Sequence, residues 1–165
     1  MSDFLIMMVN QVRRLQQSPA FIAWHEQHPS TYLAHIFYLT DTEPQVGYYN
    51  KEKDTITPFI MGSTIIQQPE QEVFKKDHSI ELLEIAEVKI SLMQVIEKAR
   101  AFQEEKYPKE QVVREIIILQ HLHLGQVYNV TFVTSSMKAL NMKLSAVSGD
   151  IMEHHVSSLM DFTQR

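Results

Sequence analysis

Apolar and polar side chains alternate without a break between Leu140 and Ala146. The apolar positions are Leu140, Met142, Leu144 and Ala146, and the polar ones between them are Asn141, Lys143 and Ser145. Successive side chains of a β-strand point to opposite faces of its sheet. The pattern therefore predicts a strand over Met137–Val147 with one face turned inward and the other turned outward.

The neighbouring segments predict further strands. Val112–Gln120 is almost continuously apolar after Arg114-Glu115, which is typical of a central strand. Gln126–Thr134 places three large apolar side chains on one face, at Tyr128, Val130 and Phe132. Ser148-Gly149-Asp150 predicts a turn in which the glycine supplies a positive φ. The tail from Ile151 is expected to be a short strand or a frayed helix.

The clearest helix begins after Ser91. Ser91 and Gln94 have the spacing of a capping box, in which each side chain bonds to the backbone of the other residue. One apolar face follows, at Leu92, Val95, Ile96, Ala99 and Phe102. Tyr107-Pro108 is expected to end the helix, because the residue before a proline disfavours helical geometry.

Two helices are predicted near the N-terminus. Ser2 caps the first, whose apolar positions recur at helical spacing, at Leu5, Met8, Val9, Val12 and Leu15. Ser18-Pro19 is typical of an N-cap followed by proline in the first helical position. That second helix carries Phe21 and Trp24, and it must end before Pro29.

Three short antiparallel strands follow, over Thr31–Leu39, Val46–Asn50 and Thr55–Met61. Pro58 lies inside the third, which indicates an edge strand or a bulge because proline has no N–H to donate. Gly62–His78 predicts a connecting loop with one short strand.

The order helix, three strands, helix, three strands indicates two related halves. We predict an α+β fold with helices packed on an antiparallel β-meander, built from two pseudo-repeated α-β-β-β halves. The division is 1–87, with the N-terminal helices, the first meander and a linker, and 88–165, with the second helix and meander. One continuous domain is the alternative.

The second half resembles the PepSY-like domain family. The matching features are the Ser-capped helix in VKISLMQVIEKA, the strand YNVTFVT, and a strand that ends in the turn SGDI. The segment VGYYNKEKDTITPFIM looks like the strand–turn–strand part of the same unit. The resemblance implies a small non-catalytic module with an inhibitory or peptide-binding role, and it brings no catalytic residues with it.

Composition excludes several classes of partner and of functional site. The formal charge is −5 and the basic residues form no stripe, so nucleic acid is not an expected partner. The absence of cysteine excludes disulfides, thiol nucleophiles and cysteine-based zinc sites. No apolar run reaches the length of a membrane span, and the N-terminus lacks the layout of a signal peptide. We therefore expect a cytoplasmic protein without a membrane span.

Histidines are the residues that could bind a metal. His121 and His123 lie two positions apart and could share one face of a strand, with Glu153, His154 or His155 as a further ligand. The simpler interpretation is a hairpin turn with exposed polar residues beside Gly125, so no metal is predicted. His25, His28 and His35 form a second group, which we interpret as exposed helical histidines and a distant residue.

The sequence contains no motif for nucleophilic catalysis or for phosphate binding. The chain contains no GxSxG sequence and no glycine-rich loop, because its four glycines are far apart. We therefore predict no catalytic residue, no cofactor and no enzymatic activity. The expected partner-binding residues are Tyr48, Tyr49 and Phe59 in the first meander, where one of the two adjacent tyrosines should face away from the helix-covered core.

Three functions are compatible with these observations. The first is a non-enzymatic protein- or peptide-binding or regulatory module that uses a sheet face or edge, with a foreign polypeptide or a second copy as partner. The second is an acidic, dimeric adaptor that resembles a secretion chaperone. The third is a histidine-dependent metalloenzyme.

Overall fold

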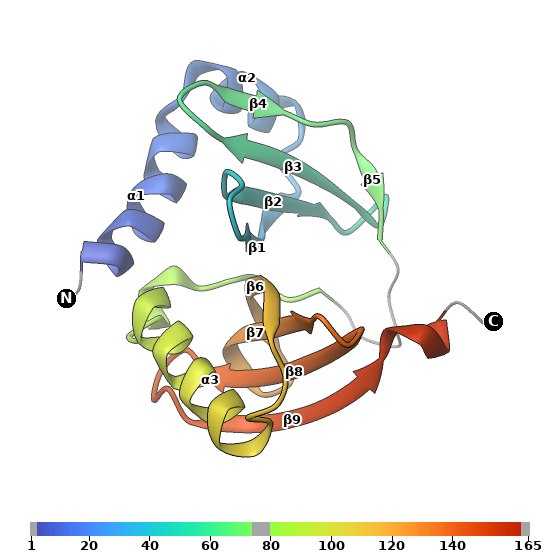
Figure 1. The fold of residues 1–165 in the computed structure, drawn as a ribbon. Coiled ribbons are helices and arrows are strands. Elements are labelled where there is room, and N and C mark those ends of the chain that lie inside the picture. The colour runs from blue at the N-terminus through green and yellow to red at the C-terminus, as the bar shows by residue number, and fades with distance from the viewer. Residues whose placement is uncertain (1–2, 74–79, 163–165) are drawn as a thin grey trace.

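Antiparallel strands form one continuous sheet in the computed structural model, which describes residues 3–73 and 80–162 (Figure 1). The N-terminal half contains the helices α1 (Asp3–Gln17) and α2 (Pro19–Gln27) and the strands β1 (Thr31–Leu39), β2 (Gln45–Asn50), β3 (Thr55–Met61), β4 (Ile65–Gln67) and β5 (Gln71–Glu72). The C-terminal half contains the 3-10 turn η1 (Ile85–Glu87), α3 (Leu92–Lys106), β6 (Val112–Leu122), β7 (Gly125–Thr134), β8 (Lys138–Ser145), β9 (Ile151–Ser158) and η2 (Leu159–Phe162).

The strand order is symmetric about the centre of the sheet. It runs β4-β3-β2-β1-β6-β7-β8-β9, with β5 also paired to β3. The first strand of each meander therefore lies at the middle, where β1 and β6 pair from His35 opposite Gln120 to Leu39 opposite Ile116. The predicted α+β fold with helices packed on an antiparallel β-meander is confirmed, and the halves share one sheet. Each half contains a predicted helix and three-stranded meander, to which the first half adds α2, β4 and β5 and the second adds β9.

The helices share one core with the sheet. The inward side chains of β8, Leu140, Met142, Leu144 and Ala146, are at most 2% exposed, as their alternation predicts. They belong to the same buried cluster as Val12 and Leu15 of α1 and Val95 of α3. Because burial of one large aliphatic side chain contributes about 1.5–3 kcal/mol, this shared core is the main force that joins the halves.

Local signals position the helices. The Ser91 hydroxyl accepts from the Gln94 amide at 3.1 Å, and the Gln94 side chain accepts from the Ser91 amide at 2.9 Å, which completes the predicted capping box. Ser18 caps α2 and Pro19 takes its first position, as expected. The predicted cap at Ser2 lies outside the described residues.

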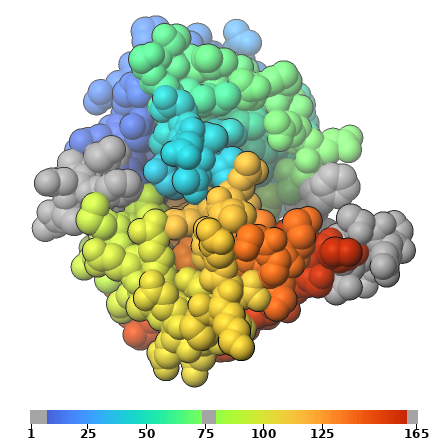
Figure 2. All heavy atoms as spheres, viewed as in Figure 1, coloured from blue at the N-terminus to red at the C-terminus, as the bar shows by residue number. Residues whose placement is uncertain are grey.

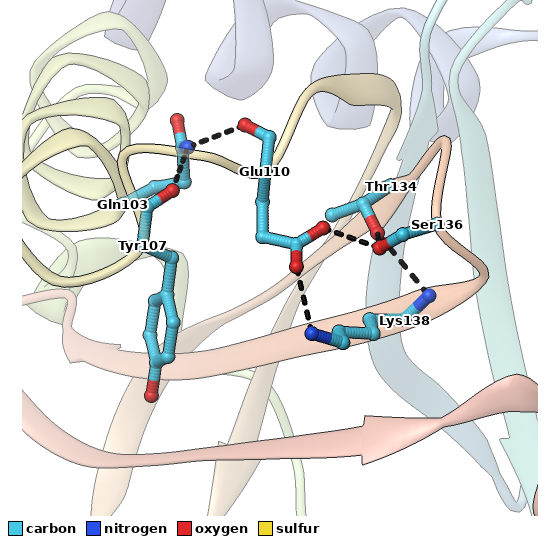
Figure 3. A network of polar contacts seen from close by, with 6 residues as sticks. All are labelled: Gln103, Tyr107, Glu110, Thr134, Ser136 and Lys138. Carbon is cyan, nitrogen blue, oxygen red and sulfur yellow. Dashed lines mark hydrogen bonds and ion pairs between the residues drawn. The ribbon is translucent and has the colours of Figure 1, made fainter.

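A polar network anchors the end of α3 to the turn between β7 and β8 (Figure 3). The buried Gln103 side chain donates to the carbonyls of Tyr107 and Glu110, both at 3.0 Å. The Glu110 carboxylate accepts from Lys138 Nζ at 2.8 Å and from the Ser136 hydroxyl. These donors lower the pKa of Glu110, Lys138 first.

The two halves also meet at the end of the central strand pair. Thr40 Oγ1 accepts from the Glu115 amide at 3.0 Å, and the Thr40 amide donates to the Glu115 carbonyl at 3.2 Å. Figure 2 shows the turn after β1, in cyan, lying against the yellow-orange atoms of β6. The junction of β1 and β6, the central seam of the sheet, is thus held by side-chain hydrogen bonds as well as by strand pairing.

Two local predictions require correction. The region after Gly62 contains two short strands, β4 and β5, where one was expected, although residues 74–79 lie outside the described part. Of the two alternatives for the tail, the strand is confirmed, and its eight residues are followed by a 3-10 turn. Strand β3 has neighbours on both sides, so Pro58 does not mark the edge of the sheet.

Pro58 is tolerated because its outer neighbour is interrupted. The Pro58 carbonyl accepts from the Gln68 amide at 2.8 Å on the outer side, and the nitrogen of a strand residue points to the same side as its carbonyl. The outer strands β4 and β5 pair with residues 59–61 and 55–56 of β3 and leave Pro58 between them. No ladder bond is lost there.

Candidate functional site

A groove of about 1250 Å³ lies between the N-terminal helices and the chain that leads into α3. Residues of α1 and α2 form one wall, residues 82–89 form the other, and β1 and β2 form the floor. Figure 1 shows that second wall as the light green segment that runs between the two halves. The groove therefore combines elements from both halves of the chain.

Helical spacing explains the first wall. Met8, Val12 and Leu15 point into the core and are at most 9% exposed. Val9 and Arg13, one position further round the helix, lie on the adjacent stripe and line the groove. One helix thus contributes to the core with one stripe and to the groove with the next.

Backbone hydrogen bonds fix the second wall. The Leu83 amide donates to the Leu33 carbonyl at 2.9 Å, and the Glu84 amide donates to Gln126 Oε1 at 3.2 Å. The amides of Lys89 and Ile90 both donate to the Ala146 carbonyl, at 2.8 and 3.0 Å. These hydrogen bonds hold the wall at both ends.

The floor is apolar and the rim is polar. Leu33, Tyr48 and Leu83 are 7%, 4% and 2% exposed at the bottom. Arg13, Glu26 and Lys89 are exposed at the rim. Two apolar side chains, Ile22 and Leu82, are also 45% exposed along the groove. An apolar centre surrounded by a polar rim is a common arrangement at protein interfaces.

Tyr48 is the predicted partner-binding residue that lines this groove. Its hydroxyl accepts from Gln16 Nε2 at 3.3 Å, and burial raises its pKa. Its ring packs on Phe21, with the ring centroids 4.8 Å apart. Phe59 lies behind it, 2% exposed, so it supports the aromatic cluster and contributes no surface.

Tyr49 points to the other face of the sheet, as the strand geometry requires, but it is not exposed. It is 1% exposed, its ring meets the edge of Tyr32, and its hydroxyl donates to Asp54 at 2.5 Å. The expectation of an open-face tyrosine ring is therefore not met, because neighbouring side chains cover this position. Partner binding through Tyr49 stays a prediction.

His25 and His28 are half-buried, which corrects the interpretation of exposed helical histidines. The His25 ring stacks on Phe21 at 5.3 Å, and the His28 ring stacks on Trp24 at 4.9 Å. His28 is the C-cap of α2, and its Nδ1 lies 2.7 Å from the Trp24 carbonyl. His25 lines the groove, and His28 extends the aromatic layer beside it.

His121 and His123 lie at the predicted hairpin turn, where Gly125 has a φ of 103°. His121 Nδ1 lies 2.9 Å from the Leu82 carbonyl, so it helps to fix the second wall of the groove. His123 is exposed, and its Nε2 lies 3.8 Å from Glu153. Within residues 3–73 and 80–162, no three histidine or acidic side chains are placed to hold a metal ion.

Residues 82–89, the second wall, are the part of the groove that the sequence did not predict as a functional site. The run LLEIAEVKI carries apolar residues at Leu82, Leu83, Ile85 and Val88 among acidic ones. That pattern indicates a segment with one buried side. It has too few residues for a helix face and no regular strand alternation, so only its long-range contacts reveal its role.

Comparison of the chain with protein-family models, with curated proteins and with solved structures found no match. The PepSY-like resemblance of the second half therefore stays a prediction. Among the described residues, no helix is both long enough and apolar enough to cross a membrane.

Proposed function

We propose that the protein is a non-enzymatic binding module that holds an amphipathic segment of another polypeptide in the groove. The observation that carries this proposal is the apolar floor of Leu33, Tyr48 and Leu83 within a rim of charged and amide side chains. Grooves of this kind receive amphipathic segments, whose apolar side chains enter the floor and whose polar side chains meet the rim. The resemblance to a peptide-binding module agrees with this function.

The charges of the rim define the partner further. Arg13 makes no ion pair with the described residues, and Lys89 Nζ donates only to the Ala86 carbonyl in its own turn. Glu26 is the acidic side chain that lines the groove. Among the side chains that line the groove, two cations thus accompany one carboxylate, which favours a partner that carries Asp or Glu beside its apolar residues.

Selection of peptides from a displayed library of random sequences tests this function. Peptides selected on the wild-type protein should combine apolar residues at helical spacing with at least one carboxylate. Ile22→Glu and Leu82→Glu change exposed positions of the groove, so both variants should fold and bind the selected peptides about tenfold more weakly or worse.

The matched controls are Ile66→Glu and Met137→Glu. These residues are 52% and 50% exposed and do not line the groove. Both control variants should bind the selected peptides like the wild type. Peptide affinities that are insensitive to Ile22→Glu and Leu82→Glu, or that fall equally in the controls, would remove the groove as the binding site.

A further inference from the structure

The two edges of the sheet are protected to different degrees. The outer strands beside β3 have three and two residues, and the chain between them contains Pro69. Short, interrupted strands and proline are the usual devices that prevent edge pairing. Strand β9 at the other edge has eight residues without proline or glycine, and its side chains are exposed from Met152 to Val156.

The backbone groups of β9 that face outward can be assigned. The Leu159 amide donates to the Met137 carbonyl at 2.8 Å, in register with the pairing of β8 and β9. The direction of the backbone groups alternates along an antiparallel strand. The N–H and C=O groups of His154, Val156 and Ser158 therefore point away from β8, toward the open edge.

A second copy of the chain can use these groups. Two identical strands that pair antiparallel are related by a two-fold axis. The outward N–H and C=O groups of one strand meet those of the other only if the axis passes through a residue, because an axis between two residues would place outward groups opposite inward ones. An axis at Glu153 would place like charges opposite each other. An axis at His155 would place two imidazoles together, and one at Val156 would leave Glu153 without a charged or imidazole residue opposite.

The axis at His154 gives a complementary arrangement. We propose that β9 pairs with β9 of a second copy about this axis and joins two sheets into one. Glu153 then lies opposite His155 of the partner subunit, in a pair whose own backbone groups face inward. Side chains in such pairs approach most closely, so the imidazole N–H can donate to the carboxylate.

The surroundings of Glu153 leave room for this contact. On its own sheet the carboxylate lies 3.7 Å from Lys143 Nζ and 3.8 Å from His123 Nε2. Lys143 and His123 both lie on the side of β9 that faces the rest of the sheet. On the opposite side, at the edge of the sheet, no described residue covers Glu153.

Sedimentation velocity on the full chain over a wide concentration range tests the proposal. The wild type should show a reversible monomer–dimer equilibrium. His155→Glu places two carboxylates opposite each other and should weaken self-association about tenfold or more. The double variant Glu153→His/His155→Glu restores an acid–imidazole pair with the two residues exchanged, and it should recover the dimer.

Hydrogen exchange shows whether the open edge of β9 becomes covered in the dimer. The amides of His154 and Val156 should exchange more slowly at high protein concentration, when the dimer forms, and Ile66→Glu at the opposite edge should change neither exchange nor self-association. A wild type that stays monomeric at every concentration would overturn the proposal. So would a dimer that His155→Glu leaves intact, or one that Ile66→Glu abolishes.

Discussion

The imidazole of His35 lies directly over Gly47, the residue opposite it on β2. A Cβ atom at position 47 would lie 2.4 Å from His35 Cε1 and 2.5 Å from its Nε2. The backbone at Gly47 does not have a positive φ, so any residue could adopt its conformation. Glycine is required there because the ring leaves no space for a side chain.

Gly47→Ala should therefore destabilise the protein by about 1–3 kcal/mol, the usual cost of forcing one extra carbon into a packed site. Chemical denaturation measures the change in the free energy of unfolding. In the double variant Gly47→Ala/His35→Ala the clash is removed, so its destabilisation should be smaller than the sum of the two single changes. Additive effects would contradict the contact.

His35 should also make stability depend on pH. Burial lowers the pKa of its imidazole from 6.5 to about 4. Between these values the unfolded state binds more protons than the folded state, so the free energy of unfolding falls as pH drops from 6.5 toward 4. The loss should be of the order of 2–3 kcal/mol.

The measurement is the pH dependence of unfolding in the wild type and in His35→Gln. Glu72 lies at the same hollow of the sheet, so only the difference between the two profiles reports the imidazole. In His35→Gln the free energy of unfolding should change less between pH 6.5 and pH 4 than in the wild type. These two pH values are the ordinary pKa of the His35 imidazole and its pKa in the folded protein. Identical slopes would show that the imidazole titrates normally.

Ser91→Ala should remove the capping box of α3. Loss of an N-cap side chain costs about 1 kcal/mol, and Ser91 is 1% exposed, so water cannot replace the hydroxyl. Thermal unfolding measures the loss. Ser91→Thr keeps a hydroxyl at this position and should recover most of the stability, whereas an equal loss in both variants would indicate packing as the cause.

Leu144→Asp should abolish cooperative folding. The side chain is 0% exposed, and none of the buried residues in the described part of the chain is a lysine or arginine that could pair with an aspartate there. The matched control is Ala139→Asp on the same strand, because position 139 lies on the opposite face and is partly exposed. A normal melting transition in Leu144→Asp, or equal damage in the control, would contradict the inward assignment.

Local patterns predict the elements of this fold well. Alternation from Leu140 to Ala146 identified the buried face of β8, and the Ser91–Gln94 spacing identified the start of α3. These signals work because they depend on residues two to four positions apart, whose relative directions are set by the strand or helix itself.

The site depends on contacts that no local pattern contains. The pattern placed Tyr48 and Tyr49 on opposite faces of the sheet, but it could not show that Tyr32 and Asp54 contact Tyr49 and cover it. The wall at residues 82–89 is placed by Leu33, Gln126 and Ala146, which are distant in sequence. The sequence therefore predicts which residues face where, and the structure is needed to show what lies against them.

The symmetric strand order has a consequence for how the chain folds. Among the described residues, strand pairs other than β1 with β6 join segments close in sequence, so each meander can form by short loop closures. The pairing of His35 with Gln120 closes a far longer loop, at a greater entropic cost. We expect the two meanders to form first and the central seam to close in the rate-limiting step.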